Sequence, residues 1–149
     1  MVITGRNKET LQKVYDQYKK VAQEDSFKIT NAVVQVIDDV TNFEVLKKLV
    51  KTAVDSFGKI DILINNAGFA FPTSIYDSNL IENYNKLMDT NLKAVIALTQ
   101  LAVHYLEKTK GVIVNVSSVA AMRPSEARIF ILIIQFIYLI VVDGNLLHD

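Results

Sequence analysis

Hydrophobic positions follow two different spacings along most of the chain. Short runs rich in β-branched residues are too short for helices and predict strands buried on both faces, at 2–4, 32–37, 60–64 and 111–116. Between these runs, apolar residues recur at helical spacing and predict three helices, spanning 11–22, 46–57 and 84–106. The second helix is expected to open with the capping box Thr41-Asn42-Phe43-Glu44 and to stop at Gly58.

The order of these elements predicts the fold class. Strands and helices alternate with short connections, which is typical of an α/β fold with parallel strands and right-handed crossovers. Ligands in such sheets bind beyond the carboxyl ends of the strands. Polar residues follow all four predicted strands, at 5–7, 38–41, 65–68 and 117–118. We therefore expect a binding site where these four strand ends converge.

Composition excludes several classes of function. Sixteen Lys and Arg balance sixteen Asp and Glu, so the chain lacks the basic excess of a nucleic-acid binder. The absence of cysteine excludes disulfides and thiolate metal sites, and two histidines are too few for a histidine cluster, so no metal site is expected. The first residues become polar too early for a signal peptide, which predicts a cytoplasmic protein.

The segment 129–142 differs from the rest of the chain, because Gln135 is its only polar residue. As a helix it would span about 21 Å, which is short of the ~30 Å hydrocarbon core of a bilayer. A buried helix or an exposed, aggregation-prone segment is therefore favoured over a membrane span. Membrane association through this segment remains the alternative.

Four motifs, in chain order, resemble those of the short-chain dehydrogenase/reductase family over about residues 2–125. They are Asp39-Val40-Thr41, Lys59-Ile60-Asp61-Ile62-Leu63-Ile64-Asn65-Asn66-Ala67-Gly68, Met88-Asp89-Thr90-Asn91-Leu92 and Gly111-Val112-Ile113-Val114-Asn115-Val116-Ser117-Ser118. The resemblance implies a doubly wound, Rossmann-like parallel sheet. It also implies an NAD(P)-dependent oxidoreductase that transfers hydride to or from a small alcohol or carbonyl substrate.

The resemblance also implies a nucleotide site at the first two strand ends. Arg6 is expected to pair with the adenosine 2′-phosphate, which favours NADP over NAD, because a guanidinium grips phosphate with two hydrogen bonds. The alternative is a solvated arginine in front of a helix. Asp39 and Val40 match the adenine-binding turn, although Asp39 and Thr41 could instead cap the next helix.

Later motifs supply the remaining candidates. Asn65, Ala67 and Gly68 are expected at the cofactor, either in direct contact or by stabilising the central sheet. Asn91 falls on the apolar stripe of the third helix and, by resemblance, bends this helix and holds a catalytic water; the alternative is a core asparagine bonded to backbone. Ser118, in preference to its neighbour Ser117, would bind the substrate oxygen, or else simply end the strand.

Two family features are missing from the sequence. No glycine-rich loop follows the first strand, so the family's first strand and loop are expected to be absent. The strand order of such a sheet is 3-2-1-4-5, in which strand 1 lies in the middle. The loss of strand 1 should therefore leave two separate strand pairs with bare edges. The Tyr-x-x-x-Lys pair is also missing after Ser118, since no lysine follows Lys110.

We therefore expect a partial nucleotide-binding domain at 1–127, without the first and C-terminal strands, followed by a divergent apolar tail at 128–149. Such a fragment is predicted to have little turnover. The alternatives are a non-catalytic interaction protein that forms homo-oligomers through its long third helix, and a membrane protein held by its tail. The substrate cannot be read from these motifs.

Overall fold

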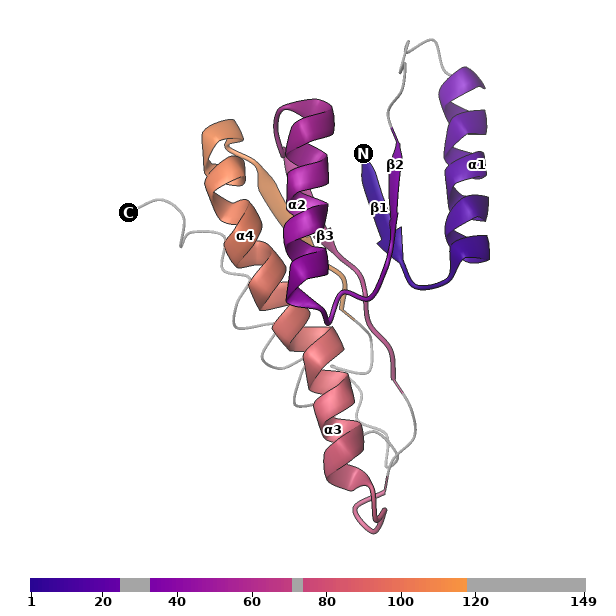
Figure 1. Cartoon of the computed structure of the whole chain (residues 1–149), viewed down its shortest axis with the longest axis vertical. Helices are drawn as coiled ribbons and strands as arrows, with labels where there is room; N and C mark the ends of the chain where they lie inside the picture. The colour runs from indigo at the N-terminus through magenta and orange to yellow at the C-terminus, as the bar shows by residue number, and fades with distance from the viewer. Residues whose placement is uncertain (25–32, 71–73, 118–149) are drawn as a thin grey trace.

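The computed structural model describes residues 1–24, 33–70 and 74–117, and it confirms the alternation of strands and helices (Figure 1). The elements in chain order are β1 (Val2–Gly5), α1 (Lys8–Glu24), β2 (Val34–Ile37), α2 (Phe43–Phe57), β3 (Ile62–Asn65), α3 (Leu80–Met88), the π-helical turn η1 (Asp89–Lys93), α4 (Ala94–Thr109) and β4 (Val112–Asn115). The four predicted strands and the three predicted helical regions are all present, the third helical region being divided into α3, η1 and α4.

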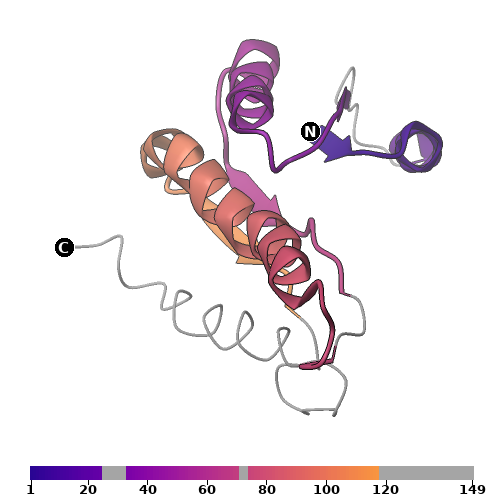
Figure 2. The ribbon, with the colours of Figure 1, turned by 60° about the horizontal axis from the view of Figure 1, so that its bottom comes forward.

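The strands form two parallel pairs instead of one continuous sheet. Among the described residues, β1 pairs with β2 and β3 pairs with β4, and the two pairs are separate sheets. In Figures 1 and 2, β1 lies between β2 and β3. The predicted separation into two pairs is therefore confirmed, with one edge of β1 and one edge of β3 unpaired in the described part of the chain.

Two helices hold the strand pairs together from one side. Residues of α2 and of β2 form a buried cluster against which the β1 side chain Val2 packs: Val36, Val45, Leu46 and Leu49. A second cluster, of Val50, Ala102 and Leu106, packs against the β3 and β4 side chains Leu63 and Ile113. Leu98 and Leu101 of α4 pack against both clusters, so one apolar layer spans both strand pairs.

Strand burial differs from the prediction, because β3 and β4 are not buried on both faces. Ile62 and Ile64 are 60% and 59% exposed, and Val112 is 56% exposed, whereas the alternate residues Leu63 and Ile113 pack against α4. Successive side chains of a strand point to opposite faces, and the described helices cover only one face of this pair. The expectation of two buried faces was therefore wrong for β3 and β4.

The ends of α2 follow local chemistry, with one correction. Gly58 ends the helix in the left-handed conformation, with φ of 74°, as predicted from its position. The N-cap is Asn42 and not Thr41, because the Asn42 side chain accepts the backbone N–H of Glu44 at 3.0 Å. The capping box proposed for Thr41 and Glu44 was wrong by one residue.

The apolar face of α1 is only partly covered. Leu11 is buried, but Val14 and Val21 are 43% and 59% exposed. This helix lies beside the β1–β2 pair at one side of the molecule (Figures 1 and 2). None of the helices in the described ranges is both long enough and apolar enough to cross a membrane. The apolar segment 129–142 lies outside the described residues.

Candidate functional site

The predicted site residues lie where the parallel strands end. The carboxyl ends of the four strands point toward the same end of the molecule, the end at which α2 and α4 begin (Figure 1). The register fixes neighbours at these ends, because Gly5 lies opposite Ile37 and Asn65 lies opposite Asn115. Residues that directly follow the paired strands are therefore brought close together.

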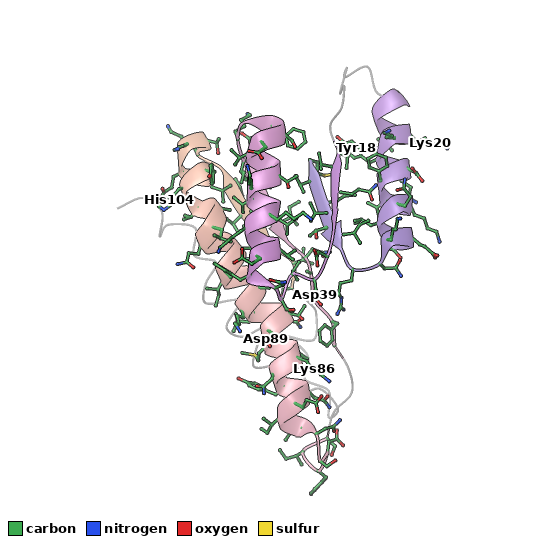
Figure 3. The ribbon with its side chains drawn as sticks, in the orientation of Figure 1. Tyr18, Lys20, Asp39, Lys86, Asp89 and His104 are labelled. Atoms are coloured by element: carbon green, nitrogen blue, oxygen red, sulfur yellow. The ribbon has the colours of Figure 1, made fainter. Side chains whose placement is uncertain are left out.

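Arg6 and Asp39 meet at the end of the β1–β2 pair. The pairing extends past the strands, since Asp38 donates its backbone N–H to the carbonyl of Gly5 at 3.1 Å. Beyond this bond, Arg6 Nη1 lies 3.6 Å from Asp39 Oδ2, and both side chains remain largely in solvent. Asp39 sits in the turn between β2 and α2 (Figure 3). The structure thus brings together a cation and a carboxylate that the sequence assigned to one nucleotide site.

The Asp39 carboxylate is fixed by its own turn. Its Oδ1 accepts the backbone N–H of Thr41 at 2.9 Å, which forms an Asx turn instead of a helix cap. The Thr41 N–H, assisted by the Thr41 hydroxyl and the Arg6 charge, holds the pKa of Asp39 below its usual range, although partial desolvation raises it. Asp39 is therefore charged at neutral pH and held in one orientation.

Val40 has a packing role. Its half-buried side chain lies against the buried cluster that includes Val36 and Leu46. This contact anchors the turn that carries Asp39 to the core. A backbone contact of Val40 with a nucleotide remains a prediction.

A pair of amides ends the second strand pair. Asn65 is only 5% exposed, and its Nδ2 donates to Asn115 Oδ1 at 2.8 Å. Val116 also donates its backbone N–H to the carbonyl of Asn65 at 2.9 Å. No role for Asn115 was predicted from the sequence. The signal was present, since Asn65 and Asn115 each end a run of three apolar strand residues.

Asn91 ties the π-helical turn to the loop that follows β3. Its Oδ1 accepts the backbone N–H of Phe69 at 3.1 Å, and its Nδ2 donates to the carbonyl of Phe69 at 2.8 Å. A Cβ on Gly68 would lie 3.4 Å from Asn91 Oδ1, so the glycine permits this close approach. The side chain is bonded to backbone, as the structural alternative predicted, and it lies in a π-helical turn of the long helix.

Some of the remaining candidate residues lie within the described part of the chain and one lies outside it. Ala67 is exposed in the loop after β3, and Ser117 is exposed after β4. Ser118, the predicted catalytic serine, lies outside the described residues. The predicted strand that precedes Ser118 is present, since β4 ends two residues before Ser117.

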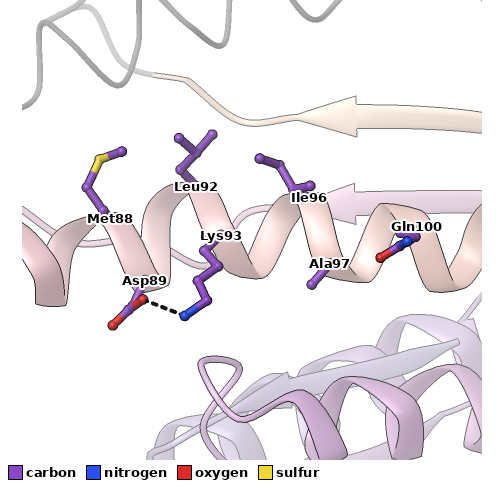
Figure 4. A pocket seen from close by; sticks show the side chains of 7 residues that line it. All are labelled: Met88, Asp89, Leu92, Lys93, Ile96, Ala97 and Gln100. Carbon is purple, nitrogen blue, oxygen red and sulfur yellow. Dashed lines mark hydrogen bonds and ion pairs between the residues drawn. The ribbon is translucent and has the colours of Figure 1, made fainter.

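A hollow on the long helix lies apart from these residues. It has a volume of about 270 Å³ and is lined by Met88, Asp89, Leu92, Lys93, Ile96, Ala97 and Gln100. Figure 4 shows the apolar side chains along η1 and α4, with Asp89 and Lys93 joined by an ion pair of 3.1 Å. None of the predicted site residues lines this hollow. The strand ends therefore remain the candidate site.

The family model for short chain dehydrogenases matches residues 1–130. The chain belongs to the short-chain dehydrogenase family. It is 33% identical over 128 residues to an uncharacterized oxidoreductase of Staphylococcus aureus (strain USA300), covering 85% of this chain and 51% of that protein. It is 32% identical to an 11-beta-hydroxysteroid dehydrogenase-like protein of Arabidopsis thaliana, covering 85% of this chain and 39% of the relative.

A solved member of the same family shares the fold. A short-chain dehydrogenase/reductase of unknown function from Caenorhabditis elegans, solved with cofactor, is 31% identical with a TM-score of 0.78, covering 92% of this chain and 50% of the other. The Rossmann-like fold predicted for the chain is thus confirmed. The chain spans about half the length, or less, of the relatives named above.

The charged groups at the end of the β1–β2 pair fit one end of a dinucleotide cofactor. An exposed guanidinium and a fixed carboxylate stand together at the carboxyl ends of adjacent parallel strands, the edge at which nucleotides bind in such sheets. After β1 the chain continues as Arg6-Asn7 into α1, so no glycine-rich turn is present there for a pyrophosphate. The residues therefore fit the adenosine half of the cofactor.

Proposed function

We propose that this chain is a nucleotide-binding portion of an NADP-dependent oxidoreductase that transfers hydride to or from a small alcohol or carbonyl substrate. The observation that carries the proposal is the approach of Arg6 and Asp39 at adjacent strand ends. A guanidinium binds a phosphate monoester through two parallel hydrogen bonds, and a carboxylate accepts a hydrogen bond from an adenine amine. Membership of the short-chain dehydrogenase family supports the reaction class.

The adenosine end of the cofactor would be held by residues of the first strand pair. Arg6 binds the 2′-phosphate, and Asp39 accepts the adenine amine while Val40 keeps the turn against the core. Asn65, Ala67 and Gly68, at the end of β3 and in the loop after it, would lie beside the cofactor. Asn65 does this indirectly, since its amide is engaged with Asn115.

Substrate chemistry would take place beyond β3 and β4. Nicotinamide supplies or accepts the hydride when the cofactor is bound. Ser118 donates a hydrogen bond to the substrate oxygen and places the carbonyl carbon for attack. Asn91 keeps the loop carrying Phe69 fixed against the long helix and so positions the loop that follows β3.

The chain alone is proposed to have little or no turnover. No Tyr-x-x-x-Lys pair follows Ser118 in the sequence, so the tyrosine and lysine that would exchange the substrate proton are missing there. Incubation of the purified full chain with NADPH and a panel of aldehydes and ketones should give no NADPH oxidation above background. Reduction at ordinary enzymatic rates would contradict this part of the proposal.

Nucleotide binding is tested separately from turnover. Titration of the full chain with NADPH, followed by nicotinamide fluorescence, should show binding that is tighter than for NADH. The variant Arg6→Ala should weaken NADPH binding about tenfold or more and leave NADH binding within about twofold, because only NADPH carries the 2′-phosphate. Lys51→Ala, an exposed cation on α2, is the matched control and should change neither. Equal affinity for NADPH in wild type and Arg6→Ala would refute the assignment.

The competing proposal is an interaction protein that pairs through the long helix. The hollow lined by Leu92 and Ile96 and the 58% exposure of Ile96 favour it. Analytical ultracentrifugation of the wild type and of Ile96→Glu decides between them. A homo-oligomer that Ile96→Glu dissociates, in a chain that binds neither dinucleotide, would support the interaction protein and reject the oxidoreductase.

A further inference from the structure

The face of the β3–β4 pair that points away from α4 carries a continuous apolar surface, the outer patch. It consists of two cross-strand pairs and one residue that follows β4: Ile62 with Val112, Ile64 with Val114, and Val116. Their side chains are between 42% and 60% exposed. A contiguous apolar surface of this kind is typical of a docking surface, whereas single exposed apolar residues are ordinary.

The two strand pairs differ on this side of the molecule, because α1 covers only the first pair. Gln35 of β2 donates its side-chain amide to Gln12 of α1 at 3.3 Å, whereas the next residue, Val36, packs against α2. Successive side chains of a strand point to opposite faces, so α1 and α2 lie on opposite faces of the β1–β2 pair. Over the β3–β4 pair, no helix of the described residues takes the position that α1 holds over the first pair.

The apolar residues that α1 leaves exposed lie on its side toward the outer patch. Leu11 faces β1, since a Cβ on Gly5 would lie 3.6 Å from its Cδ1. A helix turns by about 100° per residue, which places Gln12 about 100° from Leu11 in the direction of β2. Val14 and Val21 lie about 60° and 80° from Leu11 in the opposite direction, toward β3. Both are exposed, so an apolar edge of α1 borders the outer patch.

We infer that the segment 129–142 of this chain docks on the outer patch, beside α1. Gln135 is the only polar residue of the segment, and a helix that is apolar on all sides needs a buried position. The strands of the patch have four residues each and are about 13 Å long, against about 21 Å for the segment as a helix and about 46 Å as an extended strand. The helical length therefore fits the patch, and docking removes both apolar surfaces from water.

The connection between β4 and the segment permits docking within one chain. Only residues 118–128 separate Ser117, the last described residue, from the segment. Fully extended, this connection reaches about 36–40 Å, which is well beyond the length of the strands that it must pass. A tether of this length holds the segment at an effective concentration in the mM range, so its own chain is favoured over a second copy at micromolar protein concentrations.

The first experiment measures access to the outer patch in the full chain, which has no cysteine of its own. Ile64→Cys places a thiol on the patch, and Ile81→Cys on α3, 68% exposed, is the matched control. A polar maleimide should modify Ile64→Cys about tenfold more slowly than Ile81→Cys, relative to the rates of the two unfolded chains, because access limits thiol reactivity. Equal relative rates would overturn the inference. Circular dichroism verifies that both variants are folded.

Changes within the segment identify what covers the thiol. Ile133→Glu together with Ile137→Glu places charge in the segment and should raise the rate of Ile64→Cys to that of the control on α3. Leu146→Glu together with Leu147→Glu lies beyond the segment and should leave the thiol protected. Protection that survives the two changes within the segment would contradict the inference.

Cross-linking distinguishes the same chain from other occupants of the patch. The double variant Ile64→Cys and Ile137→Cys, mixed with its nitrogen-15-labelled form, is treated with a bismaleimide and analysed by mass spectrometry. Links within one chain are expected. Links formed exclusively between labelled and unlabelled chains would assign the patch to a second copy and overturn the inference. A chain that floats with phosphatidylcholine vesicles while Ile64→Cys reacts as fast as the control on α3 would assign the segment to lipid and would overturn it as well.

Discussion

The two strand pairs are alike in geometry but different in how they end. Both are parallel, and both have four residues in each strand. The β1–β2 pair ends in charged groups exposed to water, Arg6 and Asp39. The β3–β4 pair ends in neutral amides, of which Asn65 is buried and bonded to Asn115. The same backbone arrangement therefore presents a solvated charged end and a buried amide end.

Exposed charges and buried amides contribute to a site in different ways. Exposed charges contribute little to stability, because water and salt screen them, so they can be adjusted for ligand choice at low cost to the fold. A buried amide is costly unless its partners are present, so it fixes the geometry around it. Ligand discrimination is thus expected at the first pair, and structural rigidity at the second pair.

The largest expected effect tests whether the two pairs fold as one unit. Leu46→Ala removes a fully buried side chain under the first pair, and Leu106→Ala does the same under the second. Each should lower the free energy of unfolding by about 2–5 kcal/mol in a single transition, because Leu98 and Leu101 pack against both clusters. Urea unfolding followed by circular dichroism measures this.

The exposed Lys48→Ala on α2 serves as the control for that experiment and should change stability by less than about 0.5 kcal/mol. Two resolved transitions, with each leucine variant affecting only one of them, would show that the pairs fold independently.

A matched pair of glycines distinguishes the packing of the two regions. A Cβ on Gly111, which precedes β4, would lie 2.6 Å from the Asp61 carbonyl oxygen and 2.7 Å from Leu106 Cδ2. Gly111→Ala should therefore destabilise the protein by about 1–3 kcal/mol. A Cβ on Gly5 meets only Leu11 Cδ1, at an ordinary 3.6 Å, so Gly5→Ala should cost less than about 0.5 kcal/mol. Thermal unfolding of both variants gives the ranking, and equal costs would contradict the tighter packing around β4.

The amide pair is tested by a double-mutant cycle. Asn65→Ala leaves Asn115 Oδ1 without its side-chain donor, which should cost about 1–3 kcal/mol. The double variant with Asn115→Ala should cost less than the sum of the two single variants, since the two amides share one bond. Chemical denaturation of the four proteins provides the coupling energy. Strict additivity would mean that the bond between the amides contributes nothing.

Local sequence patterns predicted the elements, because the determinants of strands and helices are themselves local. The β-branched runs became strands, and Gly58 ended α2 in the left-handed conformation. The cap was misassigned because Thr41 and Asn42 are both good N-caps, and the choice depends on the Asp39 turn that engages Thr41. Adjacent candidates of equal propensity cannot be separated by pattern alone.

The long-range features were less accessible to sequence. The exposure of Ile62 and Ile64 depends on which helices cover each face of the strand pair. An apolar run in the sequence is the same whether helices cover one face of the strands or both faces. The approach of Arg6 to Asp39 followed from strand order, since both residues come after paired strands. The bonds from Asn91 to the Phe69 backbone needed the structure, because they join a helix to a loop with no pattern of its own.

The smallest expected effect concerns the charged end and its response to pH. The folded pKa of Asp39 is lowered, so its contribution to stability is present above the unfolded pKa and is lost as the pH falls through the folded value. Asp39→Asn should therefore remove a small part of the acid destabilisation, small because the side chain is 41% exposed and its charge is screened by solvent. Carbon-13 NMR of the Asp39 carboxyl group measures the pKa directly. In Arg6→Ala the pKa should stay below its usual range, because the Thr41 N–H is the larger cause and remains in place. A complete return to the usual value in Arg6→Ala would mean that Arg6, and not the turn, holds the charge of Asp39.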